Sequence, residues 1–321
     1  MTLDSLKDEL KLYKENEIGI CVYAILKENL YNPMRLDIES KSLNNLTSLF
    51  LTEIRDTIIN RDDLYLMKIS SSDERKNAIY EYDLDIPKEL STLDFVLEND
   101  NIGLFNLKNH DFGEIKSLII EIGNNERQVV LYKTMAPVNI FSSKHFFIKK
   151  HKSRLEKIKD DFLRITPDFQ MIKVNGRLLV INLQTLERNF GFHDIIKKEA
   201  VSGCSAIKSI NILSNPEVLI ELIEDVKYAR KLTKIAKGSP VLSAKIPNKQ
   251  IIEFCKIYPS LRNKFRFNED KEQIILDTKV SKDLFIKVLM DDFLTSELTK
   301  YNYVSLAKDN LSDSMDEQTT E

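Results

Sequence analysis

Glycine is scarce in this sequence, and no group of glycines has the spacing of a nucleotide-binding loop. The 321 residues include eight glycines, eight prolines and no tryptophan. The patterns GxGxxG and GxxxxGK[ST], whose backbone amides cradle phosphate groups, are both absent. Glycine and proline interrupt helices and strands. Because both are few, we expect regular secondary structure to make up most of the chain.

Cysteine and histidine are also few, and their spacing does not fit the common metal and disulfide sites. Cys21, Cys204 and Cys255 include no CxxC pair, and the four histidines form no HExxH pattern. Gly203-Cys204-Ser205 lacks the second glycine of a nucleophile elbow. We therefore expect buried, reduced cysteines, as in a cytoplasmic protein, and neither a metal site nor a cofactor.

Long hydrophobic runs are missing as well. No apolar stretch reaches the roughly 18 residues that a membrane-spanning helix needs. The charged, amphipathic start, residues 1–15, has no signal-peptide core. We expect a chain that neither crosses a membrane nor is secreted. Because 42% of its 321 residues are hydrophobic, it can form two domains, each with its own core.

Opposite charges dominate different parts of the chain. The overall net charge is −3, but residues 1–135 carry −9, residues 136–306 carry +10 and residues 307–321 carry −4. We predict an acidic domain over the first range, a basic domain that attracts polyanions over the second, and a disordered acidic tail over the third. The uncharged stretch 134–143 marks the expected boundary between the two domains.

The spacing of apolar residues predicts an α+β protein. In the acidic part, three- and four-residue spacing indicates helices, and alternation of apolar and polar residues indicates strands. The expected helices span residues 3–13, 42–59 and 87–97. The expected strands span residues 18–24, 34–38, 64–69 and 78–82, followed by a hairpin of 118–122 with 129–132. This part is therefore expected to be a mixed α/β domain.

Hairpins and helices are expected in the basic part. Asn175-Gly176 is the strongest short hairpin signal in the sequence. The expected elements are a hairpin of 169–174 with 177–183, a single long helix from the N-cap Asn215 to Gly238, a hairpin over 265–276, and a last helix that starts at Ser281 with a Val280–Phe285 staple.

The first of two basic clusters in this part lies between Lys144 and Lys159. Only Glu156 precedes the closing acid Asp160 there, and Phe146-Phe147-Ile148 interrupts the charge. The expected nucleic-acid contacts are Lys144, Lys149, Lys150, Lys152, Arg154 and Lys157. Lysine and arginine bind a phosphate backbone by displacing its counterions. The alternative is a solvated helix face without a ligand.

The second cluster lies on the expected long helix. The candidate contacts Lys227, Arg230, Lys231, Lys234 and Lys237 recur every three or four residues and so share one face. Cations near a helix C-terminus also complement the helix dipole, and this effect explains part of the pattern without a ligand. Arg177, directly after the Asn-Gly turn, is a further candidate phosphate contact, with a solvated turn arginine as the alternative.

One pattern is compatible with catalysis. Asp277-Thr278-Lys279 has the D-x-K form of restriction-endonuclease-like sites, in which carboxylates hold magnesium and a lysine stabilises developing charge. The acids available as partners are Glu269, Asp270 and Glu272. The alternative is that Asp277 caps the connection between strand and helix. The acids of the last helix that we expect to be exposed rather than metal-bound are Asp291, Asp292 and Glu297.

Two stretches resemble the KwaB family of the Kiwa anti-phage system. They are ITPDFQMIKVNGRLLVIN at residues 165–182, continuing with LERNFGF at residues 186–192, and DDFLTSELT at residues 291–299. The resemblance covers mainly residues 140–306. It implies bacterial phage defence with DNA binding as the effector activity. It also implies a small membrane protein of the KwaA type as partner, which would hold this cytoplasmic protein at the inner face of the membrane.

Charge and resemblance together favour a non-catalytic DNA-binding effector with little sequence preference, because no recognition helix or zinc module is evident. The first alternative is a metal-dependent nuclease that acts through Asp277 and Lys279. The second is a non-enzymatic interaction protein. Since oppositely charged parts of neighbouring chains attract one another, we also expect a homo-oligomer.

Overall fold

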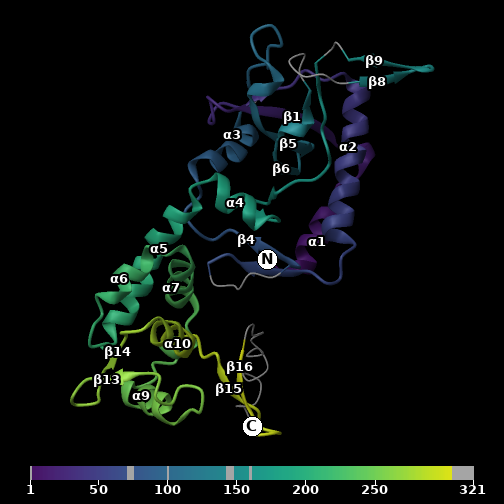
Figure 1. Cartoon of the computed structure of the whole chain (residues 1–321). Coiled ribbons are helices and arrows are strands. Elements are labelled where there is room, and N and C mark those ends of the chain that lie inside the picture. Colours follow the sequence, from purple (N-terminus) through teal and green to yellow (C-terminus); the bar gives the residue numbers. More distant parts are fainter. Residues whose placement is uncertain (1, 71–75, 100, 142–147, 159–160, 306–321) are drawn as a thin grey trace. The chain divides into compact units, whose positions relative to one another are not determined.

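Strands from distant parts of the sequence build one eight-stranded sheet (Figure 1). The computed structural model describes residues 2–70, 76–99, 101–141, 148–158 and 161–305. The chain divides into unit 1, residues 1–69 and 74–192, and unit 2, residues 70–73 and 193–321. The sheet belongs to unit 1 and has the order β2-β1-β5-β6-β11-β12-β4-β3. All neighbouring strands are antiparallel except β3 and β4, which are parallel.

The strands follow the alternation seen in the sequence. They are β1 (Gly19–Leu26), β2 (Met34–Arg35), β3 (Tyr65–Lys68), β4 (Ala78–Glu81), β5 (Ile115–Gly123), β6 (Gln128–Thr134), β11 (Met171–Val174) and β12 (Arg177–Val180). The hairpin expected from residues 118–132 is confirmed as β5 and β6. The central strands β5, β6 and β11 are buried on both faces, so the sheet forms the middle layer of unit 1.

Two amphipathic helices pack against one face of the sheet. They are α1 (Leu3–Lys11) and α2 (Ser40–Ile54), the second extended by a π-helical turn, Arg55–Ile59. Leu6, Phe50 and Ile54 belong to the same buried cluster as alternate residues of the central strands. This confirms the helices expected near residues 3–13 and 42–59, because their apolar residues recur at helical spacing.

The opposite face is covered by shorter helices. These are a 3-10 helix, Lys88–Ser91, followed by α3 (Thr92–Glu98), and α4 (Leu183–Asn189). The Phe190 ring packs edge-on against Tyr132 of β6, with 5.3 Å between ring centroids. Two further elements are 3-10 helices at Phe112–Glu114 and Pro137–Asn139.

The hairpin expected at Asn175-Gly176 is confirmed, but it belongs to unit 1 rather than to a separate basic domain. Asn175 has φ 49° and Gly176 φ 72°, as a type I′ turn requires. Strand β11 pairs with β6, so that Met171 lies opposite Tyr132. The chain therefore does not divide at residue 135, since the strands after that point complete the sheet; the two units divide after Phe192.

Unit 2 is mainly helical. Its helices are α5 (Phe192–Ser209, which starts at the boundary), α6 (Val218–Ile223), α7 (Val226–Gly238), α8 (Pro240–Ser243), α9 (Asn248–Ile257) and α10 (Lys279–Leu289). Two hairpins complete it: β13 (Arg266–Phe267) with β14 (Ile274–Ile275), and β15 (Phe293–Thr295) with β16 (Asn302–Val304). The hairpin expected at 265–276 is confirmed, and so is the α+β class of the whole chain.

The single long helix expected between Asn215 and Gly238 is wrong. The chain breaks at Asp225, whose extended backbone (φ −87°, ψ 113°) separates α6 from α7. The Asp225 side chain accepts a hydrogen bond from the Lys227 amide and so caps α7, a role for which aspartate is among the preferred residues.

The start of the last helix also differs from the expectation. Thr278 and Ser281 form a reciprocal capping box, and α10 begins at Lys279. The Val280 side chain is 54% exposed, so the predicted Val280–Phe285 staple does not form. The expected tail, 307–321, lies outside the described residues. Among the described residues, no helix combines the length and the hydropathy that crossing a bilayer requires.

The close packing of α5 on α7 gives a test of unit 2. A Cβ atom on Gly203 of α5 would lie 2.0 Å from the Leu232 carbonyl oxygen of α7. Gly203→Ala should therefore destabilise the protein by about 1–3 kcal/mol, although alanine is normally the better helix former. Denaturant unfolding measures the change. At Gly103, where a Cβ would meet nothing within 4 Å, alanine should not destabilise; equal effects at both positions would contradict the packing.

Candidate nucleic-acid interface

The first basic cluster forms a β-hairpin. Strands β8 (Ile148–His151) and β9 (Arg154–Lys157) pair in antiparallel register, with His151 opposite Arg154 next to the turn. The turn has two residues, Lys152 and Ser153, and Lys152 adopts φ 51°, in the left-handed region typical of two-residue hairpin turns. The alternative of a solvated helix face is therefore wrong for this segment.

The described side chains of this hairpin are exposed. This holds for the predicted contacts Lys149, Lys150, Lys152, Arg154 and Lys157, and for the hairpin's one acid, Glu156. The aliphatic side chains of Ile148 and Leu155 are 52% and 73% exposed. The remaining predicted contact of this cluster, Lys144, lies outside the described residues. The hairpin thus presents five cations and one carboxylate without burying any of them.

The hairpin belongs to an excursion of the chain between β6 and β11 (Figure 1). Before and after it, β7 (Ile140–Phe141) pairs with β10 (Phe162–Leu163), so the two ends of the excursion run side by side. The Arg164 amide also donates to the Asn139 carbonyl oxygen at 2.9 Å. These backbone contacts place the beginning and the end of the excursion next to each other.

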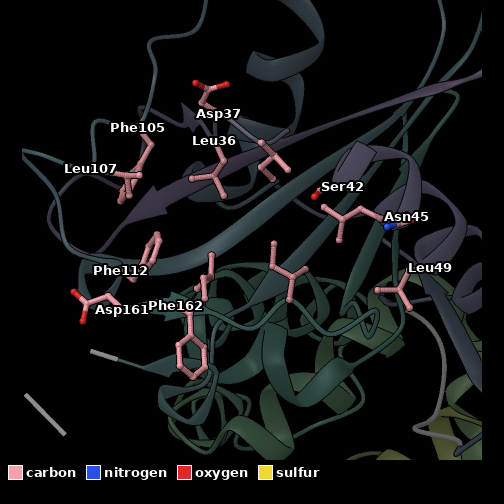
Figure 2. A pocket seen from close by; sticks show the side chains of 14 residues that line it. Leu36, Asp37, Ser42, Asn45, Leu49, Phe105, Leu107, Phe112, Asp161 and Phe162 are labelled. Atoms are coloured by element: carbon pink, nitrogen blue, oxygen red, sulfur yellow. The ribbon is translucent and has the colours of Figure 1, made fainter. Parts of the chain in front are cut away.

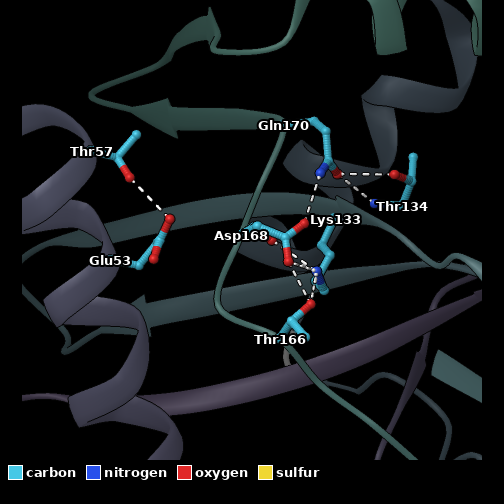
Figure 3. Close-up of polar contacts among 7 residues, drawn as sticks. All are labelled: Glu53, Thr57, Lys133, Thr134, Thr166, Asp168 and Gln170. Atoms are coloured by element: carbon cyan, nitrogen blue, oxygen red, sulfur yellow. Dashed lines mark hydrogen bonds and ion pairs between the residues drawn. The ribbon is translucent and has the colours of Figure 1, made fainter. Parts of the chain in front are cut away.

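A polar cluster holds the base of the excursion to the sheet (Figure 3). The Lys133 side chain, 1% exposed, donates to the Asp168 carboxylate at 2.7 Å and to the Thr166 hydroxyl at 2.8 Å. The Gln170 side-chain oxygen accepts from the Thr134 amide at 2.6 Å. Thus the last residues of β6 are joined by hydrogen bonds and an ion pair to the residues that lead into β11.

The Asp168 carboxylate in this cluster is held in its charged form. Partial burial alone would raise its pKa, but the hydrogen bonds from Lys133 and Thr166, with the Lys133 charge, outweigh burial. The pKa of Asp168 is therefore lowered. Because all of the polar hydrogens of Lys133 have acceptors here, the group is a structural clamp rather than a free nucleophile.

The second basic cluster, on α7, is largely paired within unit 2. The Lys231 ammonium lies 3.0 Å from the Asp283 carboxylate of α10, and Lys237 lies 3.6 Å from Glu199 of α5. Burial alone would raise the pKa of Asp283, but the hydrogen bond and charge of Lys231 lower it. Of the other predicted contacts, Lys227 is exposed, and Arg230 and Lys234 are half-buried. This face therefore contributes to helix packing, and its charges are partly neutralised.

Arg177 is likewise engaged by an acid. Its guanidinium donates to the carboxylate of Glu81, the last residue of the neighbouring strand β4, at 2.7 Å. The expectation of a merely solvated turn arginine is therefore incomplete. Its charge is offset by a neighbour that the linear sequence places almost a hundred residues away.

The nuclease residues are not assembled into a metal site. Asp277 forms an ion pair with Arg266 of β13 at 3.0 Å, and Lys279 is the first residue of α10. Thr278, not Asp277, caps that helix. The acids Glu269, Asp270 and Glu272 lie between β13 and β14. Within the described ranges, no three His, Cys, Asp or Glu residues are grouped so that they could hold a metal ion.

The acids after α10 and two of the cysteines lie in positions that do not suggest a catalytic site. Asp291 and Asp292 follow the end of α10 rather than lying on it, and Glu297 pairs with Lys300 at 2.7 Å in the β15–β16 loop. Cys204 and Cys255 are buried, as expected, and burial raises the pKa of the Cys255 thiol to about 12. A thiol with so high a pKa is a poor nucleophile at neutral pH.

Sequence reasoning did not anticipate a pocket in unit 1 (Figure 2). It has a volume of about 740 Å³, within the range of small-molecule sites. Ser42, Asn45 and Leu49 of α2 line one side, opposite Phe105 and Phe112. Among the described residues that line it, there is no Lys, Arg or His and there are two aspartates. Its lining is therefore unsuited to phosphate groups.

Comparison with known proteins identifies the family. A family model described as "Kiwa protein KwaB-like" matches residues 113–299, more than half of the chain. The chain belongs to the KwaB-like family. It is 30% identical to "Kiwa protein KwaB" of Escherichia coli O55:H7 (strain RM12579 / EPEC) over 317 residues, which are 97% of this chain and 99% of that protein. No solved structure matches the chain.

Membership of the KwaB-like family confirms the resemblance seen in the sequence and supports a role in Kiwa anti-phage defence. The family match contains the whole excursion that carries the hairpin, and it ends in the β15–β16 loop. The identity to the Escherichia coli protein extends over both units, including most of the acidic N-terminal part.

The clamp at the base of the excursion can be tested by Asp168→Asn. This change leaves the buried Lys133 ammonium without its charged partner and should destabilise the protein by about 1–3 kcal/mol. The loss should be smaller than for a fully buried pair, because Asp168 is 59% exposed. Urea unfolding at neutral pH measures it, and Asp270→Asn, at an exposed residue of the loop between β13 and β14, is the control.

The same clamp predicts a pH dependence. Because the folded pKa of Asp168 is lowered, its stabilising contribution is present above the ordinary aspartate value of about 3.9 and is lost as the pH falls through the lowered folded value. The difference in unfolding free energy between the wild type and Asp168→Asn should therefore shrink in acid. A constant difference from neutral pH to about pH 2 would contradict the clamp.

Proposed function

We propose that this Kiwa-family chain is a DNA-binding effector of anti-phage defence and that the β8–β9 hairpin makes its main contacts to the phosphate backbone. The observation that carries the proposal is the exposure of five cations on one hairpin with a single acid among them. Like charges held so close together repel one another, and a polyanion relieves that repulsion.

The geometry of the hairpin supports duplex DNA as the polyanion. A two-stranded ribbon fits the major groove of B-form DNA, which is about 12 Å wide. The hairpin cations are not confined to one side of the ribbon, because neighbouring strand residues point to opposite faces. Such an arrangement contacts the backbone on either side of a groove and carries little sequence information.

The other predicted cations take a smaller part in this proposal. Lys231, Lys237 and Arg177 each have a carboxylate partner, and replacing that partner by a phosphate would cost the existing ion pair. The α7 face thus supplies at most long-range attraction, whereas the hairpin supplies direct contacts.

The proposal assigns no catalytic step and no cofactor to the chain. Its further parts are a small membrane protein of the KwaA type as partner, a location at the inner face of the membrane through that partner, and self-association. Family membership supports the first two, and the unequal charge of the chain supports the third.

Charge reversal on the hairpin tests the DNA contact. The triple variant Lys149→Glu, Lys150→Glu, Lys152→Glu should bind a labelled DNA duplex at least about 100-fold more weakly at low salt. The slope of log affinity against log salt concentration should fall by about 2 to 3, since each lost phosphate contact removes close to one released counterion. Fluorescence anisotropy at several salt concentrations gives both quantities.

A control with the same change of net charge separates local from long-range effects. Lys41, Lys76 and Lys108 are exposed residues of unit 1 and can be reversed to glutamate together. This variant should retain most of the affinity and the full salt slope. Equal losses in the two triple variants, or no binding by the wild type at low salt, would rule out the hairpin as the interface.

The α7 face should respond differently from the hairpin. Lys231→Met removes an ion pair with Asp283 and should reduce stability by about 0.5–1 kcal/mol while changing DNA affinity by less than about twofold. Thermal unfolding and anisotropy are measured on the same sample. Lys249→Met, at an exposed lysine of α9, is the matched control. A large loss of affinity without a loss of stability would instead place DNA on α7.

A further inference from the structure

The register of the hairpin sorts its side chains onto two unlike faces. Residues that pair across the strands share a face, and successive residues alternate. One side, here called the leucine face, consists of Ile148, Lys150, Leu155 and Lys157. The opposite side, here called the glutamate face, includes Lys149, Arg154 and Glu156. The two faces carry two cations each, but only the second carries a carboxylate.

The two faces suit different surroundings. On the glutamate face, Glu156 lies directly opposite Lys149, where its charge repels phosphate and offsets the lysine. On the leucine face, each cation lies opposite an aliphatic residue: Lys150 opposite Leu155, and Lys157 opposite Ile148. No carboxylate of the hairpin lies on this face, so we expect it to attract DNA more strongly than the glutamate face does.

Electrostatic contact alone does not explain the aliphatic residues on that face. Leu155 is 73% exposed and Ile148 is 52% exposed, so neither supports a core. Phosphates and sugars offer little apolar surface, whereas the faces of unstacked bases offer a great deal. Leucine and isoleucine are among the side chains that architectural DNA-binding proteins insert between base steps.

Leu155 is the better placed of the two. Its pair with Lys150 comes directly after the His151–Arg154 pair that adjoins the turn, whereas the Ile148–Lys157 pair is the furthest from the turn. Lys150 lies directly across the strand from Leu155, and Lys152 lies in the adjoining turn, so both can contact phosphates close to an inserted Leu155 side chain.

We propose that the leucine face lies against DNA and that Leu155 inserts at an interrupted base step, so that the preferred ligand is duplex DNA whose stacking is already weakened at one step by a nick or a mismatch. This inference rests on the proposed DNA binding and names its substrate class. Unstacking one step in an intact duplex costs a few kcal/mol, and a nick or a mismatch removes much of that cost.

The test compares an intact duplex of about 25 base pairs with the same sequence carrying one central nick, by anisotropy with the full-length protein. The wild type should bind the nicked duplex at least about tenfold more tightly. Leu155→Ala should abolish this preference while leaving the salt slope unchanged, because no phosphate contact is removed. Leu155→Met, which keeps a long apolar side chain, should retain it. Leu298→Ala, at a residue 93% exposed in unit 2, is the matched control.

A second comparison assigns the face. The pair Lys150→Glu with Lys157→Glu and the pair Lys149→Glu with Arg154→Glu change the charge of the same hairpin by the same amount. The first pair should weaken binding at least about tenfold more than the second. Circular dichroism of each variant checks that the fold is kept.

The outcomes distinguish this inference from the proposed function. If Leu155→Ala keeps the preference for nicked DNA, or the two charge pairs weaken binding equally, the insertion is overturned while DNA binding by the hairpin stands. If the wild type binds the intact and the nicked duplex equally, the inferred substrate class is overturned, and DNA binding by the hairpin again stands. If the wild type binds neither duplex at low salt, the proposed function falls and the inference falls with it.

Discussion

The antiparallel pairing of β6 with β11 fixes both ends of the excursion that presents the hairpin. Since Tyr132 lies opposite Met171, the chain must return to the place where it left the sheet. The Lys133–Asp168 ion pair, the Gln170 contact and the β7–β10 pairing then hold the outgoing and returning segments together. The excursion that carries the exposed hairpin thereby begins and ends on the buried middle layer of unit 1.

The lysines and arginines of unit 1 have two separate roles. Lys133 and Lys173 are buried and paired with Asp168 and Asp94, and they stabilise the sheet and its covering helix. Buried cations are tolerated only with such partners, because desolvation of an unpaired ammonium is costly. The described cations of the hairpin have the opposite character, since they are exposed and lie on one short ribbon, and they are the ones that the proposed function assigns to a polyanion.

Net charge by segment does not show which cations are already paired within the fold. The value of +10 for residues 136–306 already subtracts Asp283 and Glu199, the partners of Lys231 and Lys237, but it counts Arg177 without its partner Glu81. Glu81, the partner of Arg177, even belongs to the part that the sequence sets apart as acidic. Because the strands of both parts complete one sheet, the division by charge at residue 135 and the division into compact units at residue 192 are different properties of the molecule.

The sequence by itself determined the local elements and the family. Alternation identified β1, β5 and β6, and Asn175-Gly176 identified the β11–β12 turn, because these features depend on neighbouring residues and on backbone preferences that act locally. The motif stretches at residues 165–192 and 291–299 resemble the KwaB family, and the family match confirms this. The first basic cluster is visible in the sequence, but its hairpin conformation was not expected, since no Gly or Asn marks the Lys152–Ser153 turn.

Only the tertiary structure decided the strand order, the break at Asp225 and which charged side chains are paired. The apolar spacing from Asn215 to Gly238 fits one continuous helix, but Asp225 can also cap a new helix. In the structure the chain takes the second course, and α6 and α7 contact each other. Ion pairs such as Lys231–Asp283 and Arg177–Glu81 join residues far apart in sequence, and the low dielectric of a partly buried site gives them their strength. A charge can be counted from the sequence, but whether it is free to meet a ligand depends on what the fold places beside it.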